Sequence, residues 1–290
     1  MITFKKILFP TDFSANANHA LLHAVRLADF HKGEVIVQHV VNDYFDRHPH
    51  WSTIFDVHEL QKHMDIFGAD EMTKILAPYS DSVSIRRVIS KGKPAEEIVA
   101  LAEKELVDLI VMGSANGVIT NKVIRATTRP VLAVSSKGIH TADESLKAAQ
   151  RILVATDFSE HSKRVVRYAF DLKEAFGASI YLLYVMETSK AIEFAFKQSH
   201  YSNTAEKMKE WAFNQLVNLT PDEFMGDPQV VRMVETGSPS DVIAMVAREI
   251  GADLTILGTH EYGLVHKSLL GTTTDKLLNK ISSPVLTVKL

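Results

Sequence analysis

The sequence predicts an α/β protein made of two tandem doubly wound domains, each a five-stranded parallel sheet with helices on both faces. Two observations lead to this prediction: a long internal repeat, and the regular alternation of short apolar runs with segments of helical periodicity. The 290 residues suffice for two domains of ordinary size, and 46% hydrophobic and 23% charged residues are typical of globular proteins.

The internal repeat keeps one offset over most of its length and then changes it. Lys6–Ser14 reads Lys-Ile-Leu-Phe-Pro-Thr-Asp-Phe-Ser and returns at Arg151–Ser159 as Arg-Ile-Leu-Val-Ala-Thr-Asp-Phe-Ser, an offset of 145. Arg129–Val134 corresponds instead to Ser283–Val288, at an offset of 154. The first copy is therefore nine residues shorter, and the missing residues fall after Gly113.

The repeat sets the expected domain boundaries. We expect a first domain over residues 1–140, a linker over residues 141–150 and a second domain over residues 151–290. The segment 135–149 is rich in Ser, Lys, Ala and Asp, which is typical of a connection between domains.

The elements of the first copy follow from the alternation of apolar runs and helical spacing. Each strand is a short apolar run that ends at polar residues, and each helix has apolar positions three or four residues apart. Strands are expected at Lys6–Pro10, Val35–Val40, Ser84–Val88, Leu109–Met112 and Val131–Val134, and helices at Asn16–Phe30, His58–Leu76 and Ala95–Glu105.

The second copy repeats this order and shows most clearly why each element should form. After the strand Arg151–Ala155, Ser159–Phe176 has helical spacing, with Ser159 or Asp157 as its N-cap and Gly177 as its stop. The run Ile180–Val185 is continuously apolar, which is typical of a parallel strand buried on both faces. Further strands are expected at Gln229–Glu235, Leu254–Leu257 and Val285–Lys289, and further helices at Ala205–Leu219, Ser240–Ile250 and Asp275–Lys280.

Composition excludes several classes of function. A net charge of −3 provides no overall basic field for nucleic acid or anionic lipid, so neither is expected as a partner. The absence of cysteine excludes disulfides, thiolate metal sites and cysteine nucleophiles. No apolar run approaches the roughly 18 residues that a membrane span needs. The N-terminus lacks the layout of a signal peptide, so we expect a cytoplasmic protein.

Three segments of the second copy should meet at the carboxyl edge of its sheet, where open parallel sheets bind ligands. They are the end of the first strand, the end of the second strand, and the end of the fourth strand with its glycine-bearing loop. Glycine lets the backbone approach phosphate oxygens, and the threonines open a helix whose N–H groups favour an anion. The candidate binding residues are Ala155, Thr156, Asp157, Val185, Leu257, Gly258, Gly271, Thr272 and Thr273.

The loop matches neither common phosphate motif, because it has no Gly-Lys-[Ser/Thr] and no Gly-x-Gly-x-x-Gly follows the first strand. The chain instead resembles the universal stress protein family, in a tandem form with two family domains. The matching motifs are Thr-Asp-Phe-Ser after the first strand, Gly-x-Pro before the third helix, Asp-Leu-x-x-x-Gly-[Ser/Thr] at the fourth strand and Ser-Pro-Val-Leu-x-Val at the end.

The resemblance implies an adenine nucleotide alpha-hydrolase-like fold and roles for individual residues. Asp157 would contact the ribose or adenine side, the Val185 backbone would read adenine, and Gly258 and Gly271-Thr272-Thr273 would hold ribose and phosphates. The implied cofactor is ATP, with the need for Mg²⁺ left open, or another adenine nucleotide. The resemblance also implies that domains pair through their last strands, so we expect a homodimer or an internal pair of domains.

Both copies depart from the nucleotide-binding motif of this family. In the second copy Glu261 stands where the motif has its second glycine, and Gly263, two residues on, is placed to re-form the turn. The first copy keeps Thr11-Asp12, Val40 and Gly113 but has no counterpart of Gly271-Thr272. We therefore expect no ATP in the first copy, where Asp12 could serve as a helix cap.

Simpler interpretations stand beside the nucleotide site. Asp157 could act only as an N-cap, and the glycines could serve only turns. No catalytic residue set is evident, so the alternatives are a nucleotide-free interaction scaffold and a slow ATP hydrolase.

The histidines and aromatic residues also have a simple interpretation. His58 and His63 are five residues apart, which is off one helical face, so surface histidines are favoured over a zinc site. Aromatic side chains gather around the second helix of the second copy, and packing is favoured over an apolar binding surface. These residues are Phe194, Phe196, Tyr201, Trp211 and Phe213.

Overall fold

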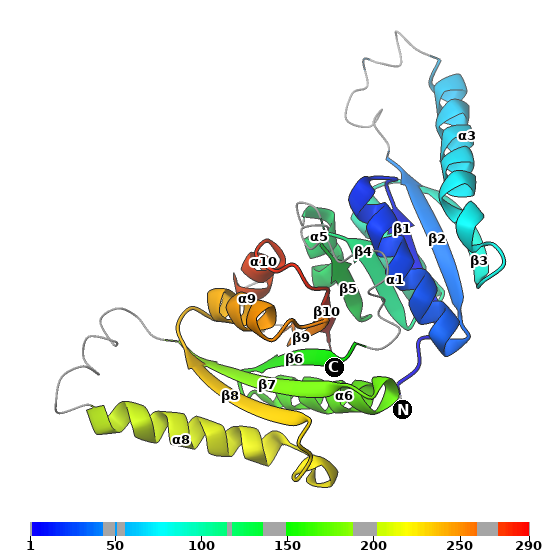
Figure 1. Ribbon diagram of the computed structural model, residues 1–290. Helices are drawn as coiled ribbons and strands as arrows, with labels where there is room; N and C mark the ends of the chain where they lie inside the picture. The colour runs from blue at the N-terminus through cyan, green and yellow to red at the C-terminus, as the bar shows by residue number, and fades with distance from the viewer. Residues whose placement is uncertain are drawn as a thin grey trace. The chain divides into compact units, whose positions relative to one another are not determined.

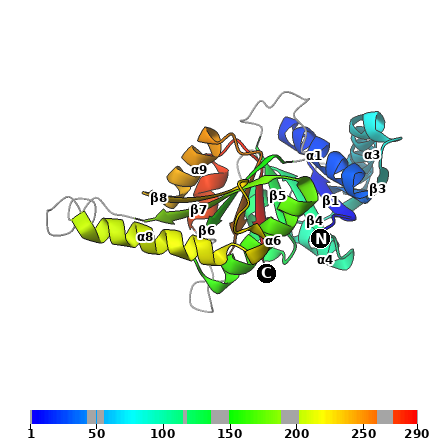
Figure 2. The same cartoon turned by 60° about the horizontal axis from the view of Figure 1, so that its bottom comes forward.

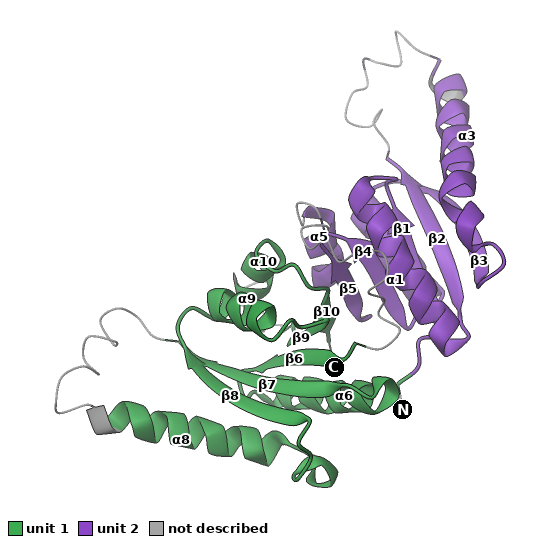
Figure 3. Cartoon of the chain, in the orientation of Figure 1, with its two compact units in different colours: residues 1–2, 137–290 green, residues 3–136 purple. Residues whose placement is uncertain are grey.

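The computed structural model describes residues 2–42, 50, 56–114, 118–135, 149–187, 202–259 and 272–289. It divides into two compact units, Thr3–Ser136 and Lys137–Leu290 together with Met1–Ile2 (Figure 3). Most of the expected linker, residues 141–148, lies outside the described residues. The domain boundaries at 140 and 150 therefore remain a prediction.

The unit Thr3–Ser136 alternates strands and helices from end to end. Its strands are β1 (Lys6–Thr11), β2 (Glu34–Val41), β3 (Ser84–Lys91), β4 (Leu109–Gly113) and β5 (Val131–Val134). Its helices are α1 (Ala15–His31), α3 (Val57–Leu76), α4 (Pro94–Lys104) and α5 (Val118–Ala126), with a 3-10 turn at Ala77–Tyr79.

The unit containing the second copy has the same plan. Its strands are β6 (Arg151–Thr156), β7 (Ser179–Met186), β8 (Val230–Thr236), β9 (Leu254–Gly258) and β10 (Val285–Val288). Its helices are α6 (Glu160–Phe176), α8 (Ser202–Leu219), α9 (Pro239–Glu249) and α10 (Thr272–Leu278), with a 3-10 turn at Asp222–Phe224.

Strand order confirms the predicted doubly wound fold in each unit. The order is β3-β2-β1-β4-β5 in the first copy and β8-β7-β6-β9-β10 in the second, and neighbouring strands within each unit pair in parallel. A parallel connection needs a crossover, and each helix between two consecutive strands provides one. The direction of winding reverses between β1 and β4, and again between β6 and β9.

The helices of the second copy cover both faces of its sheet. Helices α6 and α8 lie on one face and α9 and α10 on the other, as the views in Figure 1 and Figure 2 agree. The central strands β6 and β9 are apolar and largely buried between these helices: Ile152, Leu153, Val154 and Ile256 are all 0% exposed. Burial on both faces explains why these strands read as continuous apolar runs.

Helix α6 begins and ends as its sequence predicts. Of the two expected caps, Ser159 is the N-cap: its backbone is extended and its hydroxyl accepts from the N–H of Ser162. Gly177 ends the helix in the left-handed conformation, with φ of 66°. The inward positions Val165, Val166 and Ala169 are buried.

Helix α5 is an element that the sequence interpretation missed. The helices expected in the first copy do not include this segment, but Val118–Ala126 is a helix that buries Thr120, Val123 and Ile124. Three buried side chains at spacings of three and four residues make one helical face. The segment is too short for its periodicity to stand out in the sequence.

No helix in the described parts of the chain combines the length and apolarity needed to cross a membrane.

Burial of His31 at the end of α1 gives a pH-dependent contribution to stability. The imidazole lies edge-on to Phe4 and Phe30, with ring centroids 5.2 and 4.9 Å away. Desolvation, and secondarily the charge of Lys5, lowers its pKa below the ordinary value. The folded state therefore binds its proton less readily than the unfolded state, so stability should fall as pH drops through about 6.5.

We predict that His31→Gln reduces this acid sensitivity. Glutamine does not titrate, so the variant should lose less free energy of unfolding between pH 7.5 and pH 5.5 than the wild type does. Urea denaturation at both pH values measures the two differences. Equal losses in both proteins would contradict the prediction, whatever the absolute stability of the variant.

Candidate functional site

The strands of the second copy separate at the point where the winding reverses. The ladder between β6 and β9 runs from Ile152↔Leu254 to Val154↔Ile256, whereas β6 stays paired with β7 as far as Thr156↔Tyr184. The ends of β6 and β9 thus extend beyond their shared hydrogen bonds. This is the position at which doubly wound sheets receive ligands.

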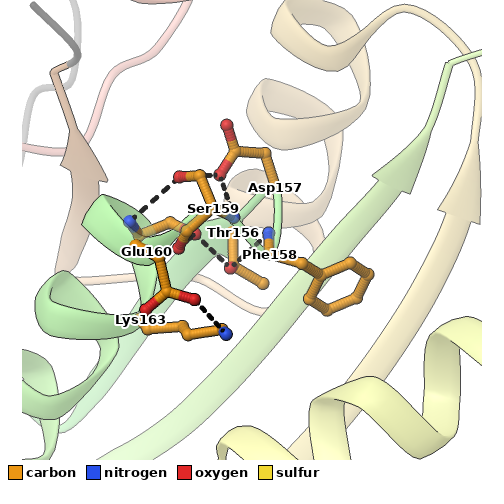
Figure 4. A network of polar contacts seen from close by, with 7 residues as sticks. Thr156, Asp157, Phe158, Ser159, Glu160 and Lys163 are labelled. Atoms are coloured by element: carbon orange, nitrogen blue, oxygen red, sulfur yellow. Dashed lines mark hydrogen bonds and ion pairs between the residues drawn. The ribbon is translucent and has the colours of Figure 1, made fainter.

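The turn after β6 is built from short-range hydrogen bonds. Thr156 is 7% exposed, and its hydroxyl accepts from the N–H of Phe158 at 3.2 Å and lies 3.0 Å from the Ser162 hydroxyl. The Oδ1 atom of exposed Asp157 accepts from the N–H of Ser159 at 3.0 Å and from its hydroxyl at 2.6 Å (Figure 4). The turn therefore fixes a carboxylate at the carboxyl edge of the sheet, where it can accept hydrogen bonds from hydroxyl groups.

Phe158 adopts an unusual backbone conformation within this turn. Its φ of 62° lies in the left-handed region, which residues with a Cβ atom disfavour. Such residues persist only where surrounding contacts hold them, and they are concentrated at functional sites. The sequence motif Thr-Asp-Phe-Ser did not reveal this strain.

Gly258 ends β9 close to the first turn of α6. A Cβ atom added at Gly258 would lie 2.9 Å from Cδ2 of His161 and 3.2 Å from Cγ2 of Val165. His161 lies beside this strand end and is not among the residues predicted from the sequence. The available sequence signal was its position two residues after the Ser159 cap. Its proximity to Gly258 could not be predicted, because it depends on how α6 packs on the sheet.

The structure places the other predicted site residues on three adjacent strands or outside the described residues. Ala155 is half-buried on β6, Val185 is half-buried on β7, and Leu257 is buried on β9. Gly263 and Gly271 lie outside the described residues, as does the side chain of Thr272, whose backbone begins α10. Thr273 is half-buried in the first turn of α10.

The first copy contains the same turn after β1. The hydroxyl of Thr11 accepts from the N–H of Phe13 at 3.0 Å, and Oδ1 of Asp12 accepts from the N–H of Ser14 at 3.0 Å. Phe13 also has φ of 62°. The N-cap of α1 is Ser14, whose hydroxyl accepts from Ala17, so the expectation that Asp12 caps this helix was wrong.

The two copies differ at the end of the fourth strand. A Cβ atom at Gly113 would lie 2.7 Å from the carbonyl carbon and oxygen of Asn16, which are backbone atoms of α1. The hydroxyl of Thr120 donates to the Gly113 carbonyl at 3.1 Å. The first copy therefore packs two helices closely against the strand end that would carry the phosphate loop.

Among the described residues, no three His, Asp or Glu side chains lie close enough together to hold a metal ion.

Aromatic packing around α8 is less complete than the sequence suggested. Trp211 and Phe213 are 54% and 46% exposed, so they do not belong to the core. Phe194, Phe196 and Tyr201 lie outside the described residues.

Comparison with known proteins agrees with the fold and the repeat. The sequence model of the universal stress protein family matches residues 3–135 and again residues 148–289. A universal stress protein of Methanocaldococcus jannaschii is 31% identical over 158 residues, which cover 47% of this chain and 98% of that protein. One from Mycolicibacterium smegmatis is 20% identical over 98% of this chain and 96% of that protein. The solved structure of a universal stress protein from Archaeoglobus fulgidus superposes with a TM-score of 0.72 at 20% identity, covering 99% of each chain.

The surroundings of the two strand-end glycines predict unequal responses to the same substitution. Gly113→Ala should destabilise the protein by about 1–3 kcal/mol, because its methyl group meets backbone that cannot rotate away. Gly258→Ala should be milder, since its closest neighbour is the His161 side chain. Chemical denaturation of both variants checks this order, and a larger loss for Gly258→Ala would refute it.

Proposed function

The chain belongs to the universal stress protein family, and we propose that its C-terminal domain binds ATP or a related adenine nucleotide and acts as a nucleotide-dependent regulator. The observation that carries the proposal is the turn at Asp157, which holds an exposed carboxylate beside the separating ends of β6 and β9. Ligands of doubly wound sheets bind at such a reversal of strand order.

Each predicted contact has a place in this proposal. The Asp157 carboxylate accepts a hydrogen bond from a ribose hydroxyl, and the backbone of Val185, two strands from β9, reads the edge of the base. At Gly258 the backbone itself approaches the ligand, because glycine has no side chain in the way. The space on its Cβ side is taken up by the side chains of His161 and Val165. The loop with Gly263 and Gly271, followed by Thr272 and Thr273, holds the phosphates.

The N-terminal domain has a different role in this proposal. It keeps the Asp12 turn, but its sequence is nine residues shorter after Gly113 and its strand end is packed against α1. It therefore binds no ATP and supports or regulates the other domain. The rival is a nucleotide-free scaffold, which the substitution of a motif glycine by Glu261 favours.

Ligand-induced stabilisation tests nucleotide binding. ATP with Mg²⁺ at 100 times its Kd should raise the free energy of unfolding by about 2.7 kcal/mol. Asp157→Asn keeps an oxygen that can accept from Ser159 but removes the charge that strengthens the ribose contact. We expect about tenfold weaker binding, the usual difference between a charged and a neutral hydrogen bond.

Asp12→Asn is the matched control, because it makes the same change in the same turn of the other copy. Isothermal titration calorimetry should give this variant the affinity of the wild type. Absence of any thermal shift at millimolar ATP would reject nucleotide binding and favour the scaffold. An equal loss in both variants would reject the assignment to the C-terminal domain.

A further inference from the structure

Three aromatic rings pack together beside the proposed nucleotide site. The ring of Phe158 stacks on Tyr184, with centroids 4.3 Å apart and planes at 24°. Trp211 of α8 meets the same Phe158 ring edge-on, with centroids 5.6 Å apart and planes at 87°. Offset stacking and edge-to-face contact are both favourable arrangements of aromatic rings. We call these three residues the aromatic cluster.

The cluster is anchored to elements that border the proposed site. Tyr184 pairs with Thr156 in the ladder between β6 and β7 and directly precedes Val185. Trp211 comes from α8, which packs on β7 and β8. Phe158 is the member that lies in the turn itself, so the cluster connects the turn to the sheet and to a helix.

Side chains leave the turn in different directions. Figure 4 shows the Asp157 carboxyl group on one side of the turn and the Phe158 ring pointing away from it, towards α8. Because the two residues are consecutive, the φ of 62° at Phe158 sets the direction in which the Asp157 carboxylate is presented. This conformation is unfavourable for phenylalanine and needs contacts that hold it.

We propose that Phe158 is a positioning residue for nucleotide binding: its ring, held between Tyr184 and Trp211, keeps the strained turn in the form that presents Asp157. The inference rests on the proposed function and adds a residue that need not touch the ligand. Trp211 should also report on the site, because its ring contacts Phe158, the residue after Asp157.

The first copy shows that this turn forms without a phosphate loop in the sequence. The ring of Phe13 lies against His39 with centroids 4.5 Å apart and planes tilted by 33°, and it meets Phe67 edge-on at 6.1 Å. Phe13 has the same φ as Phe158. The aromatic contacts and the local hydrogen bonds therefore set the turn before any ligand arrives, which is the pre-organisation that improves binding. Phe13 is also a matched control for Phe158.

Calorimetric titration with ATP and Mg²⁺ tests the role of Phe158. Phe158→Ala should bind about tenfold more weakly than the wild type, since the turn loses both ring contacts. Phe158→Tyr keeps the ring and should restore affinity to within about twofold. Phe13→Ala should leave affinity unchanged. Circular dichroism checks that each variant is folded. Trp211→Leu changes a half-exposed ring and keeps the proposal testable if Phe158→Ala fails to fold; it should weaken binding about threefold.

Fluorescence gives a second readout that a merely structural role would not move. In a Trp51→Phe background Trp211 is the single tryptophan, and its emission should change on addition of ATP with the same midpoint as the calorimetric titration. If the wild type binds ATP while Phe158→Ala and Trp211→Leu bind it equally well, the positioning role is wrong and nucleotide binding stands. If the wild type binds no ATP, both proposals fall.

Discussion

Hydrogen bonds from backbone N–H groups to the Thr156 and Ser159 hydroxyls determine how β6 passes into α6. The buried hydroxyl of Thr156 accepts the N–H of Phe158, and the hydroxyl of Ser159 accepts the N–H of Ser162. Between them, Asp157 accepts from Ser159 and stays exposed. Three side chains thus satisfy the backbone where a strand becomes a helix and where N–H groups would otherwise have no partner. Since the same bonds recur in the first copy, the turn belongs to the fold, and any ligand uses a geometry that is already present.

Both copies keep this turn, and they differ at the end of the neighbouring strand, which is β4 in the first copy and β9 in the second. In the second copy β9 ends beside a side chain, that of His161. In the first copy β4 ends against the backbone of α1, and Thr120 of α5 binds the last strand carbonyl. The proposed division of roles between the domains therefore rests on differences at the ends of β4 and β9 and in the loop that follows. The strand order of the two sheets is the same.

Much of this architecture could be predicted from the sequence, because apolar runs and helical spacing are local properties. The apolar run at Ile180–Val185, which forms most of β7, and the cap and stop of α6 belong to this class. Contacts between distant residues could not be predicted in the same way. The approach of His161 to Gly258 and the packing of Trp211 on Phe158 arise only when helices pack on the sheet. The left-handed backbone of Phe158 was also hidden, because the residue type gives no sign of it.

The close packing of Gly113 against α1 limits what a longer loop after this residue could achieve. Side chains rotate, so a strand end bordered by an imidazole can admit new atoms by a change of rotamer. Carbonyl and amide groups in a helix cannot move alone, so a strand end bordered by them admits new atoms only if the whole helix shifts. Insertion of a nine-residue loop after Gly113 would lengthen the chain without reopening the space beside it. Room for a ligand beside Gly113 therefore needs a shift of α1 as well as a longer loop.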